Sequence, residues 1–334
     1  MEKPIYIPEE QLRFLYRLAD TKNQVNWHAQ YKPNLPLLEE VVPLMQDFVA
    51  QGIKNVTFDQ NSLRAVIGVS GGIDSALTTW LTAQTMRKAR ETGTVKDTSL
   101  ILLAFQGMSE EDFEYAKRFI EDVSINFADL PMDYQERDLT TLLKTIDGTT
   151  DEIVRASGRR KFYSGELSTR LIDCITLEFA NKTLHCSMDS TNYSEIVLGE
   201  INLGAGCECA PQTCMYKSQI FDLSEIVGVP NYIIDRHPIN STFGHSKLNG
   251  YFGQLPDALS PREVYRVLDL VLFMLYDLGF LPGVVAEKLG HSNKFVENVS
   301  RRLKRQDHRR QVPHFEILDN NLRSKIFEGS FIWN

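Results

Sequence analysis

The residues best placed to do chemistry form one short run, Ser70-Gly71-Gly72-Ile73-Asp74-Ser75. An apolar run at 65–69 precedes it, and a segment with helical character at 76–81 follows it. Paired glycines let the backbone approach an anion closely, and the free N–H groups at a helix start favour negative charge. The two serines add hydroxyl donors. This order of strand, glycine turn and helix start predicts a phosphate-binding loop.

Asp74 is unusual in a phosphate cradle, because it would repel phosphate unless it holds a cation or orients the loop. The loop also lacks the Gly-Lys-Ser/Thr ending of the P-loop, which disfavours transfer of a γ-phosphate. The run resembles instead the SGGxDS loop of the ATP-pyrophosphatase (PP-loop) enzymes. Those enzymes cleave ATP between the α- and β-phosphates to activate an acceptor as its adenylate. An ordinary strand-to-helix turn rich in Gly and Ser is the alternative.

The composition is that of a globular protein with a sizeable core. The chain has 334 residues, of which 43% are hydrophobic and 24% charged. Its formal net charge of −8 argues against a general nucleic-acid binder. No segment approaches the roughly 18 apolar residues of a membrane span, and no apolar signal core begins the chain, so we expect a cytoplasmic protein. Five cysteines without a secretion signal argue against a disulfide framework.

Alternating apolar runs and amphipathic segments predict an α/β fold with a doubly wound, mostly parallel sheet. We expect a crossover helix that begins at 76–81, a helix at 110–122, and strands at 65–69, 99–105, 124–127 and 183–188. The run at 99–105 hardly alternates, which is typical of a buried parallel strand. Ligands of such sheets bind at the carboxyl ends of the strands, and Ser70 lies at such an end.

Helices are expected on both sides of this unit. Residues 1–60 carry amphipathic helical patterns and form a predicted N-terminal segment that packs on the core, leaving 61–334 as the main domain. In the C-terminal part we predict helices at 220–227, 262–278, 286–291 and 295–304, with Gly228 as a C-terminal signal and Ser260 as an N-cap. The long segment 238–259 is predicted to be a loop, of a length often used for lids or binding loops.

Further motifs follow the loop in a fixed order: 165–171, 190–195, 204–208, Lys217 and 307–313. Together they resemble ammonia-dependent NAD synthetase, a PP-loop family, over roughly residues 35–315. The resemblance implies an adenine nucleotide alpha-hydrolase-like fold with helical N- and C-terminal parts. It also implies an amide ligase, a homodimer, and ATP and Mg²⁺ as cofactors. In that reaction the carboxylate of deamido-NAD attacks ATP, pyrophosphate leaves, and ammonia displaces AMP.

The resemblance also implies roles for individual residues. The catalytic pair is Asp74 and Lys217, and Mg²⁺ is held by Asp74 and Glu195. ATP is bound by Ser70, Gly71, Gly72, Asp74, Ser75, Arg170 and Lys217. The acceptor is bound by Glu166, Glu208, His308 and Arg309. The charge types fit, because Mg²⁺ prefers one or two carboxylates with phosphate oxygens and Arg binds phosphate bidentately. For each residue alone a solvated surface charge is the alternative, and His308 with Arg309 also suits a basic helix end.

Departures from the family pattern cluster on the acceptor side. Glu166 stands where the family has Asn, and Gly204-Ala205 lacks the first Asp of a loop whose second Asp is only partly restored by Glu208. The segment 238–241 has lost a Thr and an Asp. The ATP half is intact, so the sequence supports an adenylating ligase more firmly than it supports NAD as the product. Amidation of a different carboxylate is one alternative, and a non-catalytic ATP-binding protein is another.

Three cysteines, Cys207, Cys209 and Cys214, raise a further alternative. They could ligate a metal, hold an iron–sulfur cluster or carry sulfur, as in sulfur-inserting PP-loop enzymes. Structural zinc, however, usually needs four ligands and paired C-x₂-C spacing, which this segment lacks. Free cysteines also behave as small buried hydrophobic residues, and we favour that interpretation.

Overall fold

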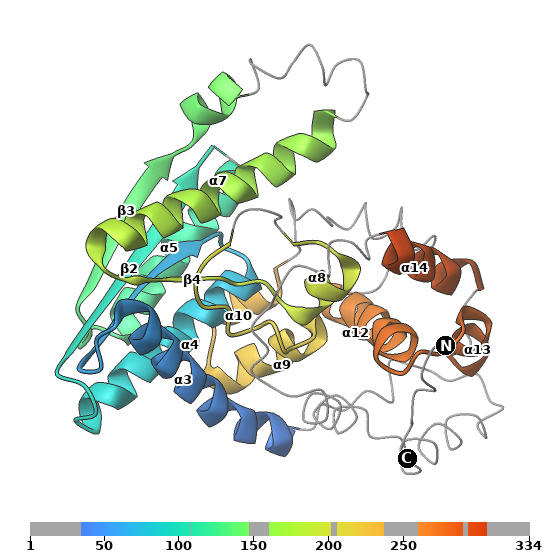
Figure 1. The fold of residues 1–334 in the computed structure, drawn as a ribbon, viewed down its shortest axis with the longest axis horizontal. Coiled ribbons are helices and arrows are strands. Elements are labelled where there is room, and N and C mark those ends of the chain that lie inside the picture. Colours follow the sequence, from blue (N-terminus) through green and yellow to red (C-terminus); the bar gives the residue numbers. More distant parts are fainter. Residues whose placement is uncertain are drawn as a thin grey trace.

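A four-stranded parallel sheet lies on one side of the molecule, at the left of Figure 1. The computed structural model describes residues 35–107, 109–146, 160–201, 206–236, 260–289 and 293–305. The strands are β1 (Ser62–Val69), β2 (Asp97–Gln106), β3 (Met132–Asp138) and β4 (Cys186–Met188), in the order β3-β2-β1-β4. All three neighbouring pairs are parallel. The predicted parallel α/β sheet is confirmed.

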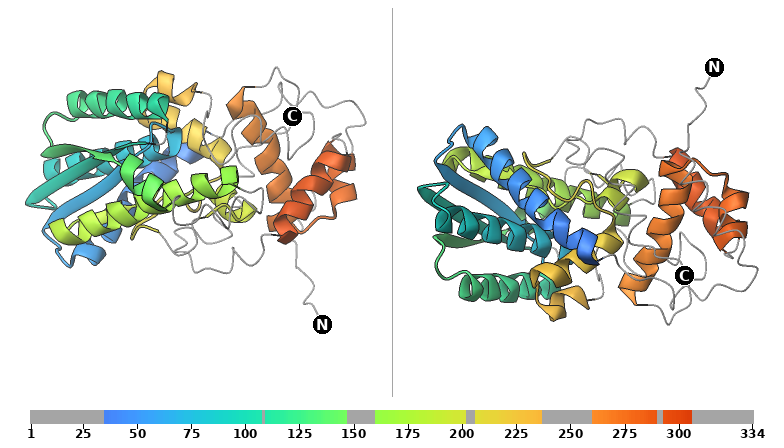
Figure 2. Two further views of the ribbon diagram at one scale, coloured as in Figure 1. Left: turned by 90° about the horizontal axis from the view of Figure 1, so that it is seen from above. Right: turned by 90° about the horizontal axis from the view of Figure 1, so that it is seen from below.

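Helices cover both faces of the sheet (Figure 2). Alternate residues of β1 divide between two apolar clusters: Ala65 and Ile67 face one, and Val66 faces the other. The first cluster is closed by α3 (Leu35–Thr57), α4 (Ile73–Glu91) and α5 (Glu110–Asn126). The second is closed by α7 (Arg160–Thr183). This two-sided burial explains why β1 and β2 are almost continuously apolar, and it confirms the doubly wound arrangement.

The predicted third strand at 124–127 is wrong. Helix α5 continues through Asn126, and the third strand is β3, six residues further on. Val123 and Phe127 bury their side chains in the core from the helix end. The strand β3 is polar and largely exposed because it lies at the edge of the sheet, so it carries no apolar run that would mark it. The predicted fourth strand shortens to the three residues of β4.

The C-terminal part is helical, as predicted. Helices α9 (Lys217–Val227) and α10 (Asn231–Ile234) pack against the sheet unit. A second core lies to one side (Figure 2), formed by α8 (Tyr193–Leu198), α12 (Pro261–Leu272), the π-helix η1 (Phe273–Asp277), α13 (Pro282–Leu289) and α14 (Asn293–Arg305). Gly228 ends α9 in the left-handed conformation, and Ser260 caps α12, so both signals are confirmed.

Two predictions of organisation stay predictions. The predicted loop at 238–259 lies outside the described residues, which end at Arg236 and resume at Ser260. The division of the chain at residue 60 stays a prediction as well, although α3 buries Leu38, Met45 and Ile53 in the same core as the sheet. Within the described ranges, no helix is long and apolar enough to span a membrane.

Candidate active site

The loop after β1 is built around Gly71. Its φ of +73° lies in the left-handed region. A Cβ at this position would lie 2.7 Å from the carbonyl oxygen of Asp112 and 2.9 Å from the amide nitrogen of Ala116, both on α5. Only glycine meets both demands, because any side chain would be strained and would clash with backbone. The chain therefore turns tightly against the first turn of α5 before α4 begins.

The two serine hydroxyls close the loop from inside. The hydroxyl of Ser75 accepts a hydrogen bond from the amide of Ser70 at 3.1 Å and donates to the carbonyl of Gly72 at 3.1 Å. The Oγ atoms of Ser70 and Ser75 lie 3.0 Å apart. Gly72 is the N-cap of α4 and has no side chain to cap the first turn. The amides of that turn thus remain oriented toward an anion at the helix start.

Asp74 and Lys217 form an ion pair beside this loop. The Nζ atom of Lys217 donates to Oδ2 of Asp74, and Nδ2 of Asn192 donates to Oδ1 at 3.1 Å. Gln212 adds a hydrogen bond of 2.6 Å from Nε2 to the carbonyl of Asp74. Lys217 is buried, and a buried ammonium group is stable only when it is paired. These hydrogen bonds of Asp74 therefore connect the N-termini of α4, α8 and α9.

The position of Lys217 is fixed from behind by Asp269. One carboxylate oxygen of Asp269 accepts from the hydroxyl of Ser194 at 2.6 Å, and the other accepts from the amide of Ser218 at 2.7 Å. Ser194 in turn accepts from the amide of Lys217 at 2.8 Å. Burial raises the pKa of Asp269 to about 6, although the hydrogen bonds from Ser194 and Ser218 oppose the rise. This carboxylate joins α12 to the starts of α8 and α9.

Glu195 lies next to the ion pair and has an unusual pKa. Its Oε2 atom accepts from the amide of Asn192 at 3.1 Å, and the side chain of Asn192 accepts from the amide of Glu195 at 3.1 Å, which makes a capping box at the start of α8. Burial, and then the nearby carboxylate of Asp74, raise the pKa of Glu195 to about 8. Two carboxylates that repel each other in this way fit a divalent cation between them.

These groups meet where β1 and β4 end. The two strands are parallel neighbours, and the chain leaves β1 toward β2 on one side while β4 lies on the other. Such a switch point opens a crevice at the carboxyl ends of the strands, which is where α/β proteins bind ligands. The loop of Ser70–Ser75 follows β1, and the segment that carries Asn192 and Glu195 follows β4. The site is therefore that of a nucleotide-binding α/β protein.

Comparison with known proteins identifies the family. The family model described as NAD synthase matches residues 42–313. The chain belongs to the NAD synthase family. The NH(3)-dependent NAD(+) synthetase of Pyrococcus furiosus is 25% identical over 277 residues, or 82% of this chain and 93% of that protein. That of Methanocaldococcus jannaschii is 25% identical over 278 residues, covering 83% and 96%.

Solved structures show the same fold. A structure of NMN synthetase from Francisella tularensis has a TM-score of 0.55 and 17% identity, covering 84% of this chain and 98% of that one. The NH3-dependent NAD synthetase from Campylobacter jejuni has a TM-score of 0.53 and 17% identity over the same shares of the two chains. As a member of the NAD synthase family, the chain is a carbon–nitrogen ligase that uses ATP and Mg²⁺ to make NAD by amidation.

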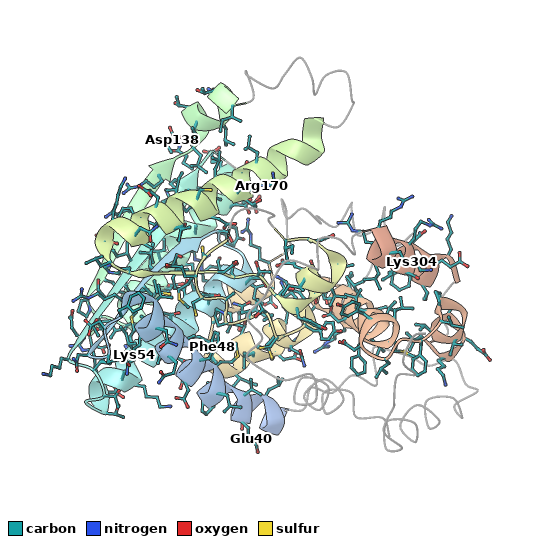
Figure 3. All side chains as sticks on the ribbon, viewed as in Figure 1. Glu40, Phe48, Lys54, Asp138, Arg170 and Lys304 are labelled. Atoms are coloured by element: carbon teal, nitrogen blue, oxygen red, sulfur yellow. The ribbon has the colours of Figure 1, made fainter. Side chains whose placement is uncertain are left out.

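The remaining predicted site residues differ in what the structure describes of them. Arg170 lies on α7 (Figure 3) and is half-buried. Ile172, two residues further along α7, lies 3.3 Å from the place where Gly68 would carry a Cβ, so Arg170 lies close to the level at which β1 ends. The side chain of Glu166, and both His308 and Arg309, lie outside the described residues.

The side chain of Glu208 forms hydrogen bonds with Ser187 of β4. Its Oε2 atom accepts from the amide of Ser187 at 2.9 Å and from the hydroxyl of Ser187 at 3.1 Å. Its own amide donates to the carbonyl of Ser187 at 3.0 Å. Ser187 is the middle residue of β4, so Glu208 fastens the segment after residue 206 to the end of the sheet. A role of Glu208 in acceptor binding stays a prediction.

Three of the cysteines behave as buried hydrophobic residues. Cys186, Cys209 and Cys214 are buried, Cys207 is half-buried, Cys174 is exposed, and none of the five forms a disulfide. The thiol of Cys209 lies where a side chain on Gly52 would collide with it, at 2.7 Å from the ideal Cβ. Burial raises the pKa of Cys207, which keeps that thiol protonated. In the part of the chain that the structure describes, no group of three or more His, Cys, Asp or Glu could hold a metal ion.

Proposed function

We propose that the chain is an ammonia-dependent NAD synthetase in which the ion pair of Asp74 and Lys217 serves the adenylation step. The observation that carries this proposal is the position of that pair. Lys217 is buried and Asp74 is half-buried, and the pair adjoins the glycine loop at the start of α4 and lies near Glu195. In the first step the nicotinate carboxylate of deamido-NAD attacks the α-phosphorus of ATP and pyrophosphate leaves. In the second step ammonia attacks the acyl-adenylate and AMP leaves.

Each group has a defined task in the first step. The loop of Ser70, Gly71, Gly72 and Ser75 presents its hydroxyls and amides to phosphate oxygens. The ammonium group of Lys217 has three N–H donors, of which one is held by Asp74, and it neutralises the charge that develops as pyrophosphate leaves. The ring centroids of Tyr265 and Phe221 lie 5.7 and 6.0 Å from Nζ, so the ammonium group lies near two aromatic rings that attract a cation. Arg170 supplies a further cation to the phosphates.

Asp74 and Glu195 are the residues that would hold Mg²⁺. The raised pKa of Glu195 reflects burial and the neighbouring carboxylate of Asp74, and both effects favour a cation at this place. When bound, Mg²⁺ neutralises phosphate charge. The protein's own contribution is to orient both carboxylates, through Asn192 and Lys217 for Asp74 and through the capping box for Glu195.

The acceptor side and the assembly form a second part of the proposal. We assign acceptor binding to Glu166, Glu208, His308 and Arg309, on the family order of the motifs that contain them. We also propose that the protein is a homodimer in the cytoplasm. Its use of free ammonia, or of ammonia from a partner, agrees with the ammonia-dependent relatives. The sulfur-inserting and non-catalytic interpretations are not favoured, because the family match extends over most of the chain.

The deciding experiment measures pyrophosphate release from ATP and Mg²⁺ with ammonium, in the presence and absence of deamido-NAD. We expect release only with deamido-NAD, and NAD as the product. Asp74→Asn should abolish release, whereas Asp47→Asn, an exposed carboxylate on α3, should leave it unchanged. Release with another carboxylate but not with deamido-NAD would contradict the proposed acceptor. Absence of release with any carboxylate would contradict the proposed reaction.

A further inference from the structure

Arg236 makes a contact with the ATP loop that the family resemblance does not explain. It follows α10 and lies 165 residues beyond Gly71 in the sequence, yet its Nη1 atom donates to the carbonyl oxygen of Gly71 at 2.9 Å. Its Nη2 atom donates to Oδ1 of Asp112 on α5 at 2.5 Å. The guanidinium carbon lies 4.0 Å from the ring centroid of Tyr115. Only 7% of the side chain is exposed, so a carbonyl, a carboxylate and an aromatic face fix the guanidinium plane.

The carbonyl that Arg236 holds belongs to the peptide between Gly71 and Gly72. The N–H of the same peptide donates to the hydroxyl of Ser70 at 3.3 Å, and that hydroxyl lies 3.0 Å from the hydroxyl of Ser75. The two ends of a trans peptide point in opposite directions. The bond from Arg236 therefore fixes the carbonyl on the α5 side and the N–H on the side of the two serine hydroxyls.

The bond from Arg236 restricts a peptide that two glycines would otherwise leave free to rotate. Glycine populates both signs of φ, so a Gly-Gly peptide can turn over at little steric cost. A turned peptide would lose the bonds to Arg236 and Ser70, and it would direct a carbonyl oxygen toward the serine hydroxyls. A carbonyl oxygen repels phosphate, whereas an N–H attracts it. The freedom that lets the loop form thus also allows a conformation that cannot bind ATP.

We infer that Arg236 is a positioning residue for ATP, which holds the Gly71–Gly72 peptide in the orientation that accepts phosphate. Asp112 and Tyr115 orient Arg236 in turn, so the first turn of α5 and the end of α10 together support the loop. This role rests on the proposed function, because it requires the phosphates of ATP to bind at the loop. Arg236 itself need not touch ATP.

A purely structural role of Arg236, joining α10 to α5, is the competing explanation, and Arg87 is a matched control for it. Arg87 also spans a carboxylate, a carbonyl and an aromatic ring. Its Nε atom donates to Oδ1 of Asp129 at 3.0 Å, its Nη2 atom donates to the carbonyl of Asn126 at 2.5 Å, and its guanidinium carbon lies 4.4 Å from the ring centroid of Phe127. It lies in the last part of α4, far along the helix from the loop.

The experiment measures the Kd of ATP and of inorganic pyrophosphate, each with Mg²⁺, by calorimetry, together with the Tm and the KM of deamido-NAD. Arg236→Met should raise the Kd of both phosphate ligands about tenfold or more, because a charge-assisted hydrogen bond to the loop is lost. Arg236→Lys should give a smaller rise, since one ammonium group cannot span the carbonyl and the carboxylate. Arg87→Met should lower the Tm and leave both Kd values within about twofold of the wild type.

The outcomes separate the inference from the proposed function. Equal effects of Arg236→Met and Arg87→Met on the Kd of ATP would overturn the inference. So would a rise in the KM of deamido-NAD as large as the rise in the Kd of ATP. If Arg236→Met does not fold, an unchanged Kd in Arg236→Lys overturns it. A wild-type protein that binds ATP and forms no NAD contradicts the proposed function alone, and one that does not bind ATP contradicts both.

Discussion

Two loops at the carboxyl ends of neighbouring strands build the same site by different means. After β1, six consecutive residues supply a cradle of backbone amides and two hydroxyls. After β4, the contribution comes from side chains. Asn192 donates to Asp74, which also pairs with Lys217 from α9, and Ser194 donates to Asp269 from α12. The first region is local in sequence, and the second exists only when α8, α9 and α12 have packed together.

This difference predicts how each region responds to mutation. Backbone donors survive a side-chain substitution, so damage to the loop after β1 is partial. In the second region the charges are carried by individual side chains, so one substitution removes a whole charge. The largest effects should therefore come from the region after β4 and from its ion pair, and smaller ones from the loop hydroxyls.

Lys217→Met should have the largest effect on activity. The substitution keeps most of the apolar stem but removes the charge that faces Asp74, so the transition state of pyrophosphate release loses its buried cation. We expect kcat/KM for ATP to fall by about 10²–10³-fold, measured by pyrophosphate release. Lys88→Met is the control, because Lys88 lies on the exposed side of α4 and donates to Gln46. Equal activity of the two variants would contradict the assignment of Lys217.

Glu195→Gln should have the second largest effect on activity, and it should change the dependence of the rate on pH. The raised pKa of about 8 means that the carboxylate becomes fully ionised only above pH 8, so binding of a cation by Glu195 should improve as the pH rises through this value. We expect exchange of labelled pyrophosphate into ATP, with deamido-NAD and without ammonia, to rise with pH at low Mg²⁺. Higher Mg²⁺ should move this rise to lower pH.

The glutamine variant tests the origin of that rise. Glu195→Gln should lose about tenfold or more in rate and show a flat profile, since the titrating group is gone. Glu178→Gln, an exposed residue of α7 paired with Lys182, should retain the wild-type profile. A wild-type rate that does not change between pH 6.5 and 9 at low Mg²⁺ would count against Glu195 as a cation ligand.

Ser75→Ala should have an intermediate effect, since it tests the loop after β1. It removes a hydroxyl that bonds the amide of Ser70 and the carbonyl of Gly72, yet it leaves the amides of the loop in place. We expect the KM of ATP to rise about tenfold, with kcat changed less, because one or two hydrogen bonds are lost. Ser124→Ala on α5 removes a comparable bond to a helix carbonyl away from the site. A larger loss than that of Lys217→Met would reverse the comparison.

The same contrast explains what the sequence could predict. The strand β1, the glycine turn and the start of α4 are consecutive, so their apolar run, glycines and serines could be interpreted together. The capping box of Asn192 and Glu195 also has a local pattern, a capping residue followed three positions later by Glu, which could have located the start of α8. The family order pointed to Lys217 as a partner of the loop, and the ion pair with Asp74 agrees with it.

Other features had no local signal. The strand β3 could not be predicted from apolar alternation, because an edge strand exposed to solvent does not need it. Arg236 reaches Gly71 across 165 residues, and nothing in its neighbourhood marks it. Asp269 stands out as a carboxylate within the apolar run of residues 267–272, which indicates a buried polar contact. Its partners Ser194 and Ser218 depend on how α12 crosses α8 and α9, which the pattern of one helix does not contain.

Asp269→Asn should have the smallest effect on activity and a distinct effect on stability. Asparagine keeps one acceptor for the amide of Ser218, and its Nδ2 can donate to the hydroxyl of Ser194, so we expect kcat/KM to change by no more than about threefold. The folded pKa of Asp269, about 6, is above its usual value of 3.8, so the folded state binds the proton more tightly than the unfolded state.

The stabilisation from that proton is fully present below pH 3.8 and is lost as the pH rises through 6. Relative to Asp269→Asn, the wild type should therefore gain about 1–3 kcal/mol in its free energy of unfolding between pH 7 and pH 4. Urea unfolding at a series of pH values measures this difference, and Asp47→Asn, an exposed carboxylate, should not reproduce it. A constant difference between wild type and Asp269→Asn would mean that the carboxylate is ionised throughout, held by Ser194 and Ser218 alone. Asp269 would then position Lys217 as a permanently ionised carboxylate. The pH dependence of the region after β4 would come from Glu195 only.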